Sequence, residues 1–82
     1  MRLEIITPNG TFYSGEADSV TLPGTMGSFQ VLRNHAPIIS SLTKGMLSFT
    51  AEGHNRAMEV VDGFVEVSNN VITVCIDKIK GK

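Results

Sequence analysis

The sequence predicts an all-β protein, a small antiparallel β-sandwich of about ten short strands. Turn-forming residues recur roughly every eight to twelve positions, which is typical of small sandwiches and barrels. Only one stretch of more than a dozen residues, 64–80, lacks both Gly and Pro. It is rich in Val and Ile, and it places Ser68 and Asn69 where a helix would need apolar side chains. This stretch is therefore expected to form strand, turn and strand, and helix is scarce.

Alternating polarity defines the first strand, and turn residues bound the others. Leu3 and Ile5 alternate with polar neighbours, as in a strand that is buried on one face. Pro8-Asn9-Gly10 then turns the chain into the second strand. The strands expected after this turn cover residues 11–14, 17–22, 28–32, 38–42, 46–51, 57–61, 64–67 and 71–76.

The segment 22–37 is expected to form a shaped surface loop around one short strand. Pro23 and Gly24 should end the preceding strand, because Pro lacks an amide donor and Gly tolerates positive φ. Asn34 accepts a left-handed backbone, and Pro37 pushes the residue before it toward an extended conformation. The segment therefore combines two turns with a rigid corner.

Turn residues also mark the second half of the chain. Lys44-Gly45 and residues 52–55 separate predicted strands, as does Asn69-Asn70. Asp62-Gly63 is a strong hairpin signal, because a type I′ turn needs positive φ at both central positions. The sequence therefore predicts a hairpin at Asp62-Gly63.

Residues 1–82 are expected to form a single domain, with a core at 1–77 and a frayed tail at 78–82. Apolar residues at alternate strand positions should line the space between the two sheets. These are Leu3, Ile5, Val20, Leu22, Val31, Leu47, Phe49, Val60, Val65, Val67, Ile72 and Val74.

Charge and cysteine content narrow the functional classes. The net charge is −1, with 7 basic and 8 acidic residues, so no strong field would attract nucleic acid or an anionic membrane. Charged residues are 18% of the chain, against a typical ~25%, which favours a place inside a complex. Cys75 is expected to be a reduced, buried thiol. No apolar run is long enough for a membrane helix, so the chain is expected to be cytosolic or peripheral to a membrane.

The sequence offers few residues for catalysis or metal binding. His35 and His54 are nineteen residues apart, and neither is paired with Cys75 at a spacing typical of zinc sites. Residues 24–27 contain a lone Gly-x-x-Gly with no following Lys-Ser/Thr, so a turn is favoured over a phosphate cradle. The carboxylates are spread singly along the chain. No catalytic residue, cofactor or metal is therefore expected.

Two surface residues suit a protein contact better than they suit chemistry. His35, with Ala36 and Pro37, is either a histidine satisfied by neighbouring backbone or a contact to a partner, and the residues alone leave both interpretations open. Met26 should be exposed at a turn tip between glycines. An unbranched, polarisable side chain in such a place is better used against a partner than against water.

The run at 22–37 has the sequence Leu-Pro-Gly-Thr-Met-Gly-Ser-Phe-Gln-Val-Leu-Arg-Asn-His-Ala-Pro. It resembles the Pro-Gly-x-x-Gly-x-x-Gly-Val-Leu-Pro-Gly-His-Ala-Pro pattern of the epsilon subunit of the F-type rotary ATP synthase. Residues 7–15 match the first hairpin of that family, and 44–47 and 63–67 fall where its later turns fall. The resemblance covers Leu3 to Asp77, and the ordered set of four motifs carries it.

This resemblance implies a β-sandwich that is a non-catalytic rotor subunit of the proton-translocating ATP synthase. Such subunits tie the gamma subunit of the central stalk to the membrane c-ring, peripheral to the cytoplasmic side of the cell inner membrane. The matching residues expected to contact gamma are Thr7, His35, Ala36 and Ser40. Those expected to contact the c-ring are Thr25, Met26, Gly27 and Ser28.

The chain departs from the family pattern in several places. Met26 and Ser28 replace acidic residues that often flank the tip glycine, Gln30 replaces a glycine, and Arg33-Asn34 replaces Pro-Gly. The sequence stops at Lys82, without the helical hairpin that inhibits ATP hydrolysis in many members. Neither inhibition nor ATP sensing is carried over.

Two other hypotheses remain at the level of sequence. One is an unrelated cytosolic β-sandwich that binds a peptide or small ligand, which would show an apolar pocket with convergent polar groups or a long unprotected edge strand. The other is a small enzyme that uses His35, which would require a partner acid beside that histidine.

Overall fold

A computed structural model describes residues 1–79, which form eight strands and contain no helix. The strands are β1 (Arg2–Thr7), β2 (Gly10–Glu16), β3 (Ser19–Gly24), β4 (Gly27–Leu32), β5 (Ile38–Leu42), β6 (Gly45–Ala51), β7 (His54–Ser68) and β8 (Val71–Ile79). The predicted all-β sandwich is confirmed, with eight strands in place of about ten. The predicted tail at 78–82 begins inside β8, and its residues 80–82 lie outside the described part.

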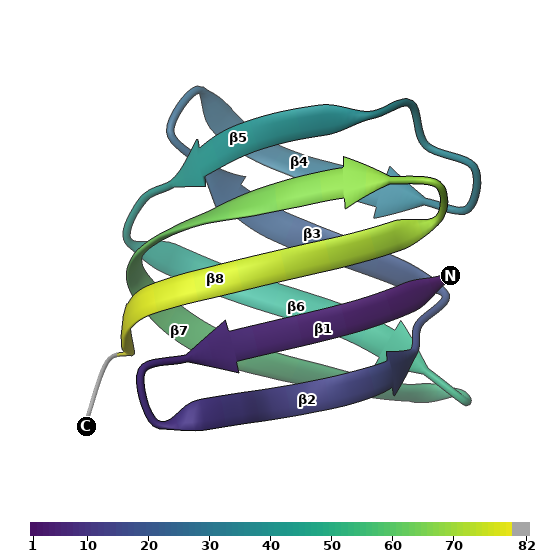
Figure 1. The fold of residues 1–82 in the computed structure, drawn as a ribbon, viewed down its shortest axis with the longest axis horizontal. Helices are drawn as coiled ribbons and strands as arrows, with labels where there is room; N and C mark the ends of the chain where they lie inside the picture. The colour runs from purple at the N-terminus through teal and green to yellow at the C-terminus, as the bar shows by residue number, and fades with distance from the viewer. Residues whose placement is uncertain (80–82) are drawn as a thin grey trace.

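The strands pack as two layers that share the long strand β7 (Figure 1). The C-terminal half of β7 lies between β8 and β5, whereas its N-terminal half pairs with β6. The front layer therefore runs β2-β1-β8-β7-β5, and the back layer runs β7-β6-β3-β4. A further pairing between Gly24 of β3 and Leu42 of β5 ties the two layers together at one end.

The predicted hairpin at Asp62-Gly63 is wrong, because β7 continues through both residues. The pairing of β7 with β8 shifts register on either side of Asp62, which marks a β-bulge. A Cβ at Gly63 would lie 2.4 Å from the carbonyl oxygen of Cys75. Gly63 therefore allows the backbones of β7 and β8 to approach closely and does not form a turn. The bulge lies where β7 passes from one layer to the other.

The predicted strand end at Pro23-Gly24 is also wrong by two residues. β3 runs through both, with Pro23 opposite Ser28 and Gly24 opposite Gly27. A proline near the end of a strand forfeits only one ladder hydrogen bond. The carbonyl oxygen of Pro23 still accepts a hydrogen bond, from the Thr43 N–H at 2.8 Å.

Within the described residues the sandwich is antiparallel except for one pair of strands, because β1 pairs with β8 in parallel. In the front layer, β1 therefore lies between β2 and β8. On β8, Val74 is buried while Cys75 faces the other side and is only half-buried. The prediction of a buried thiol is therefore corrected: Cys75 is free but lies on the outer face.

The predicted core is confirmed, since each of its twelve residues is at most 3% exposed. Five further buried apolar residues were not predicted, namely Met1, Ala17, Leu42, Met58 and Ile76. Two of the predicted turns are also confirmed, at Glu52-Gly53 and Asn69-Asn70, and both have positive φ at each central residue.

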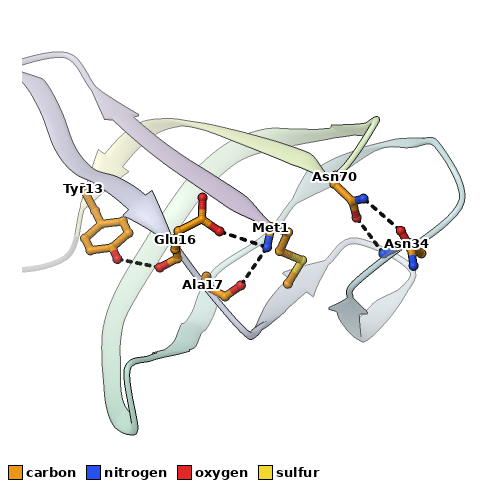
Figure 2. Close-up of polar contacts among 6 residues, drawn as sticks. All are labelled: Met1, Tyr13, Glu16, Ala17, Asn34 and Asn70. Atoms are coloured by element: carbon orange, nitrogen blue, oxygen red, sulfur yellow. Dashed lines mark hydrogen bonds and ion pairs between the residues drawn. The ribbon is translucent and has the colours of Figure 1, made fainter.

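Met1 is held in place by the segment that follows β2 (Figure 2). Its ammonium group donates hydrogen bonds to Glu16 Oε1 and to the Ala17 carbonyl oxygen, both at 3.3 Å. The Ala17 N–H donates back to the Met1 carbonyl oxygen at 2.8 Å. Tyr13 adds a bond from its hydroxyl to the Glu16 carbonyl oxygen at 2.8 Å. These contacts anchor β1 to the connection between β2 and β3.

Candidate functional site

The β4–β5 connection at 34–37 and the turn at 25–28 lie at opposite ends of the sandwich. The corner leads directly into β5, and the other end of β5, at Leu42, pairs with Gly24 beside the tip. The two segments thus flank the length of β5, and Figure 1 shows the β4–β5 and β3–β4 connections at the two ends of the longest axis. That axis extends 31 Å. We call residues 25–28 the apex and residues 34–37 the corner.

The apex is a tight turn with an exposed methionine. Met26 is 98% exposed, as the sequence predicted for a turn tip. Thr25 braces the turn, since its N–H donates to the Ser41 carbonyl oxygen at 3.1 Å and its Oγ1 lies 2.9 Å from Ser41 Oγ. A Cβ at Gly24 would lie 2.8 Å from both the Gly27 carbonyl oxygen and the Phe29 ring, so the two strands approach closely. The base of the apex is therefore braced against β5.

The corner is held by a reciprocal pair of asparagine contacts (Figure 2). Asn34 adopts φ 64°, which confirms the predicted left-handed backbone. Its N–H donates to Asn70 Oδ1 at 2.6 Å, and Asn70 Nδ2 donates to Asn34 Oδ1 at 2.9 Å. Asn70 was predicted in a turn, but its contact with the corner was not, because nothing local indicates a partner 36 positions away.

His35 is half-buried and satisfied by backbone groups. Its N–H donates to the Leu32 carbonyl oxygen at 3.1 Å, and its ring Nδ1 donates to the Ala36 carbonyl oxygen at 2.7 Å. This arrangement fits the first of the two open interpretations of His35, and it leaves the rest of the ring edge available for a contact. The acid that an enzyme would need beside His35 is not among its hydrogen-bond partners in the described part of the chain.

The structure brings together the four residues predicted for c-ring contact but not the four predicted for gamma contact. Thr25, Met26, Gly27 and Ser28 are consecutive and all exposed. His35 and Ala36 adjoin in the corner. Ser40 lies opposite Val65 of β7, and its side chain faces inward from β5. Thr7 lies at the apex end of the molecule, where its Oγ1 donates a hydrogen bond to the Gly10 carbonyl oxygen at 2.9 Å.

In the described part of the chain, the ionisable side chains are spread over the surface rather than gathered in one place. Within residues 1–79, no three His, Cys, Asp or Glu side chains are grouped so that they could hold a metal ion. Two shallow hollows of about 350 and 360 Å³ lie on the surface, and each is lined by one charged residue, Arg56 in the first and Glu66 in the second. Over the same residues, no helix is long and apolar enough to cross a bilayer.

Comparison with known proteins gives the same family along the whole chain. The sequence matches the family described as "ATP synthase, Delta/Epsilon chain, beta-sandwich domain" over residues 1–82. It is 40% identical over 75 residues to the ATP synthase epsilon chain of Desulfitobacterium hafniense, covering 92% of this chain and 57% of that protein. It is 42% identical over 73 residues to the ATP synthase epsilon chain of Pelotomaculum thermopropionicum, covering 89% and 54%. The chain thus spans little more than half the length of these relatives.

Solved structures share the fold at lower identity. A chain of the Euglena gracilis mitochondrial ATP synthase, in an assembly of OSCP, F1 and c-ring, superposes with a TM-score of 0.86 at 20% identity, covering 93% of this chain and 49% of that one. A chain of the Tetrahymena thermophila mitochondrial ATP synthase, in an assembly of central stalk and c-ring, superposes with a TM-score of 0.82 at 14% identity, covering 95% and 63%. Since the family match extends over residues 1–82, the chain belongs to the beta-sandwich family of ATP synthase delta/epsilon chains.

Proposed function

We propose that this chain is a non-catalytic rotor subunit of a proton-translocating ATP synthase, linking the gamma subunit to the c-ring within the central stalk. The observation that carries the proposal is the match to the delta/epsilon beta-sandwich family over residues 1–82. Membership of that family also removes the alternative of an unrelated β-sandwich module. Rotation of the ring, driven by proton flow, would reach the catalytic head through gamma with this chain as the connecting body.

The placement of the two contact surfaces supports an adaptor role. The apex and the corner lie at opposite ends of the sandwich, and each is braced by hydrogen bonds to a neighbouring strand or turn. A joint that carries torque must not deform under load, and a close-packed interior resists compression. One continuous core lies between the two surfaces. A partner at each end would therefore be connected through a stiff body.

We assign gamma to the corner end and the c-ring to the apex end. His35 and Ala36 would contact gamma, and Thr25, Met26, Gly27 and Ser28 would contact the ring. Thr7 could contact the same gamma surface only if that surface runs along the front layer toward the apex end. Ser40, whose side chain faces inward, could contact it only through the edge of β5. The chain would be peripheral to the membrane, on the cytoplasmic side of the cell inner membrane, and would need no cofactor or metal.

The gamma contact is tested by replacing each of the two histidines in turn. His35→Glu puts a charge in the corner and should weaken binding to purified gamma by about tenfold or more if His35 is central to the interface. His54→Glu is the matched control, since His54 is exposed at the start of β7. It should change binding by less than about twofold, as expected for a surface residue outside the interface. Isothermal titration calorimetry would measure both.

Failure of the unmodified chain to bind gamma at micromolar concentrations would overturn the proposed function. Equal losses from the two histidine substitutions would instead overturn the assignment of gamma to the corner, while the subunit's place in the stalk would stand.

A further inference from the structure

One connected set of strands carries no charge. β3, β4, β5 and β6 contain no Asp, Glu, Lys or Arg, and β3 pairs with each of the other three. Between Asp18 and Glu52 the only charged residues are Arg33 and Lys44, and both lie in connections between strands. About a quarter of residues are charged in an ordinary soluble domain. Charged side chains are depleted where one protein covers another, so this region has the composition of a covered surface.

The outer face of the back layer is lined by hydroxyl and amide groups. Ser19, Thr21, Gln30, Ser48 and Thr50 line the hollow of about 350 Å³, with Arg56 of β7 at its margin. The guanidinium of Arg56 lies 5.7 Å from the centroids of both the Tyr13 and the Phe49 rings, within cation–π distance, while the residue as a whole stays exposed. On β3, β4 and β6 the side chains of this face can donate and accept hydrogen bonds but cannot form ion pairs, and the carboxylate of the face, Glu59, lies on β7 beside Met46.

The apex terminates this uncharged region and presents its most exposed apolar side chain. Met26 is 98% exposed, whereas the backbone beneath it is fixed by Thr25 and Ser41. A fixed backbone lowers the ordering cost of association, because fewer degrees of freedom are lost when a partner binds. The flexible thioether can adapt to an irregular apolar hollow. This combination fits an anchor residue rather than a residue that faces water.

We propose that Met26 is an apolar anchor that inserts into an uncharged hollow on the loop surface of the c-ring, with Thr25 and Ser28 as hydroxyl-bearing neighbours at its rim. This inference rests on the proposed function and specifies the chemistry of the ring contact. The complementary ring surface would be apolar at its centre and rimmed by neutral polar groups. Attraction between exposed charges weakens as salt is added, with a screening length of about 8 Å at physiological ionic strength, whereas apolar burial has no such screening. The contribution of Met26 to binding is therefore independent of salt.

The test uses the chain assembled with gamma and a c-ring embedded in nanodiscs, with the dissociation constant measured at low and at high potassium chloride. Met26→Leu should bind within about threefold of the unmodified chain, because the volume and apolar character are kept. Met26→Ala should bind about tenfold more weakly, as expected for truncation of an interface anchor. The ratio of these two dissociation constants, Ala variant over unmodified chain, should be the same at both salt concentrations. This ratio cancels any salt-dependent contacts that gamma makes with the ring.

Opposite charges at the same position separate an apolar from an electrostatic contact. Met26→Glu and Met26→Lys should both weaken binding by about tenfold or more, because either charge would be desolvated in a neutral hollow. An electrostatic site would instead favour one sign, so tighter binding by either variant overturns the proposal. Phe12, which is 47% exposed on β2 in the other layer and outside the uncharged strands, provides the control. Phe12→Glu and Phe12→Lys should leave ring binding within about twofold, as expected outside an interface.

Equal losses at Phe12 and Met26, or no loss with Met26→Ala, would overturn the anchor role. Binding of gamma without the ring shows that each variant is folded and separates the two proposals. If the unmodified chain binds neither gamma nor the ring, the proposed function fails. If it binds both but no Met26 substitution matters, only this inference fails.

Discussion

Asparagine residues with left-handed backbone hold the loops at the corner end of the molecule. Among residues 1–79, four residues other than glycine have positive φ, and three of them are Asn34, Asn69 and Asn70. Asn tolerates this conformation better than most residues do. Asn34 and Asn70 also exchange two hydrogen bonds, so the conformation of one turn depends on the side chain of the other.

Replacing Asn70 with Gly should therefore destabilise the protein, although glycine accepts the same φ. We expect a loss of about 1 kcal/mol, the net value of hydrogen bonds near a surface. Asn69→Gly is the matched control, because Asn69 shares the turn and the left-handed backbone but lies outside the pair. It should change the free energy of unfolding by no more than a few tenths of a kcal/mol.

Urea unfolding would give both values, and amide hydrogen exchange at Asn34 would report on the corner. Faster exchange should appear only in Asn70→Gly, since the Asn34 N–H loses its acceptor there. The same exchange rate in both variants would show that the asparagine pair does not hold the corner.

At the scale of elements, β7 decides the architecture, because it belongs to both layers. A strand can change layer where it bends and its twist increases, and a bulge supplies both. The bulge at Asp62 and Gly63 requires the backbone of β8 to approach closely. A residue with any side chain at position 63 would meet that backbone.

Gly63→Ala should consequently be among the most destabilising small substitutions in the chain. The added Cβ would lie 2.4 Å from the Cys75 carbonyl oxygen and 3.0 Å from the Ile76 Cα, and no rotamer change can relieve a clash with backbone. We expect a loss of about 3 kcal/mol, the upper part of the range for overpacking. Thermal or urea unfolding would measure it.

Gly15→Ala on β2 is the control for this prediction. Its added Cβ would meet only the end of the Tyr13 side chain, at 3.1 Å from the hydroxyl, and that side chain can shift. The loss should stay below about 1 kcal/mol. Similar losses at the two glycines would mean that the close approach at the bulge is not what position 63 requires.

At the scale of the whole molecule, the two layers share one core. Buried residues from both layers form a single cluster, with Leu47 on β6 and Ile72 on β8 each 0% exposed. A single core predicts that the layers unfold together. A stiff body between the corner and the apex depends on this cooperativity.

Truncation in either layer should therefore lower the stability of the entire chain. Leu47→Ala and Ile72→Ala should each cost about 3 kcal/mol, as is usual for a large aliphatic residue in a packed interior. Circular dichroism and the fluorescence of Tyr13 should give coincident urea midpoints in each variant. Separate midpoints would show that the layers are independent and would remove the basis for a stiff adaptor.

Many structural features of this protein depend only on single residues and their sequence neighbours, so the sequence could predict them. The alternation of apolar residues predicted all twelve core positions, because the side chains of a strand point to opposite faces whatever its partners are. The left-handed Asn34 and the exposed Met26 followed in the same way, from the properties of single residues and their immediate neighbours. The family resemblance is likewise a local property, because contiguous motifs carry it.

Only the tertiary structure decided which distant segments meet. The parallel pairing of β1 with β8, the bulge in place of a hairpin at Gly63, and the contact of Asn34 with Asn70 all depend on segments far away in the chain. So does the separation of Thr7 from His35, which have no local relation in sequence. A pair such as Asp62-Gly63 permits a turn, but the packing of β8 against these residues determines whether the turn forms.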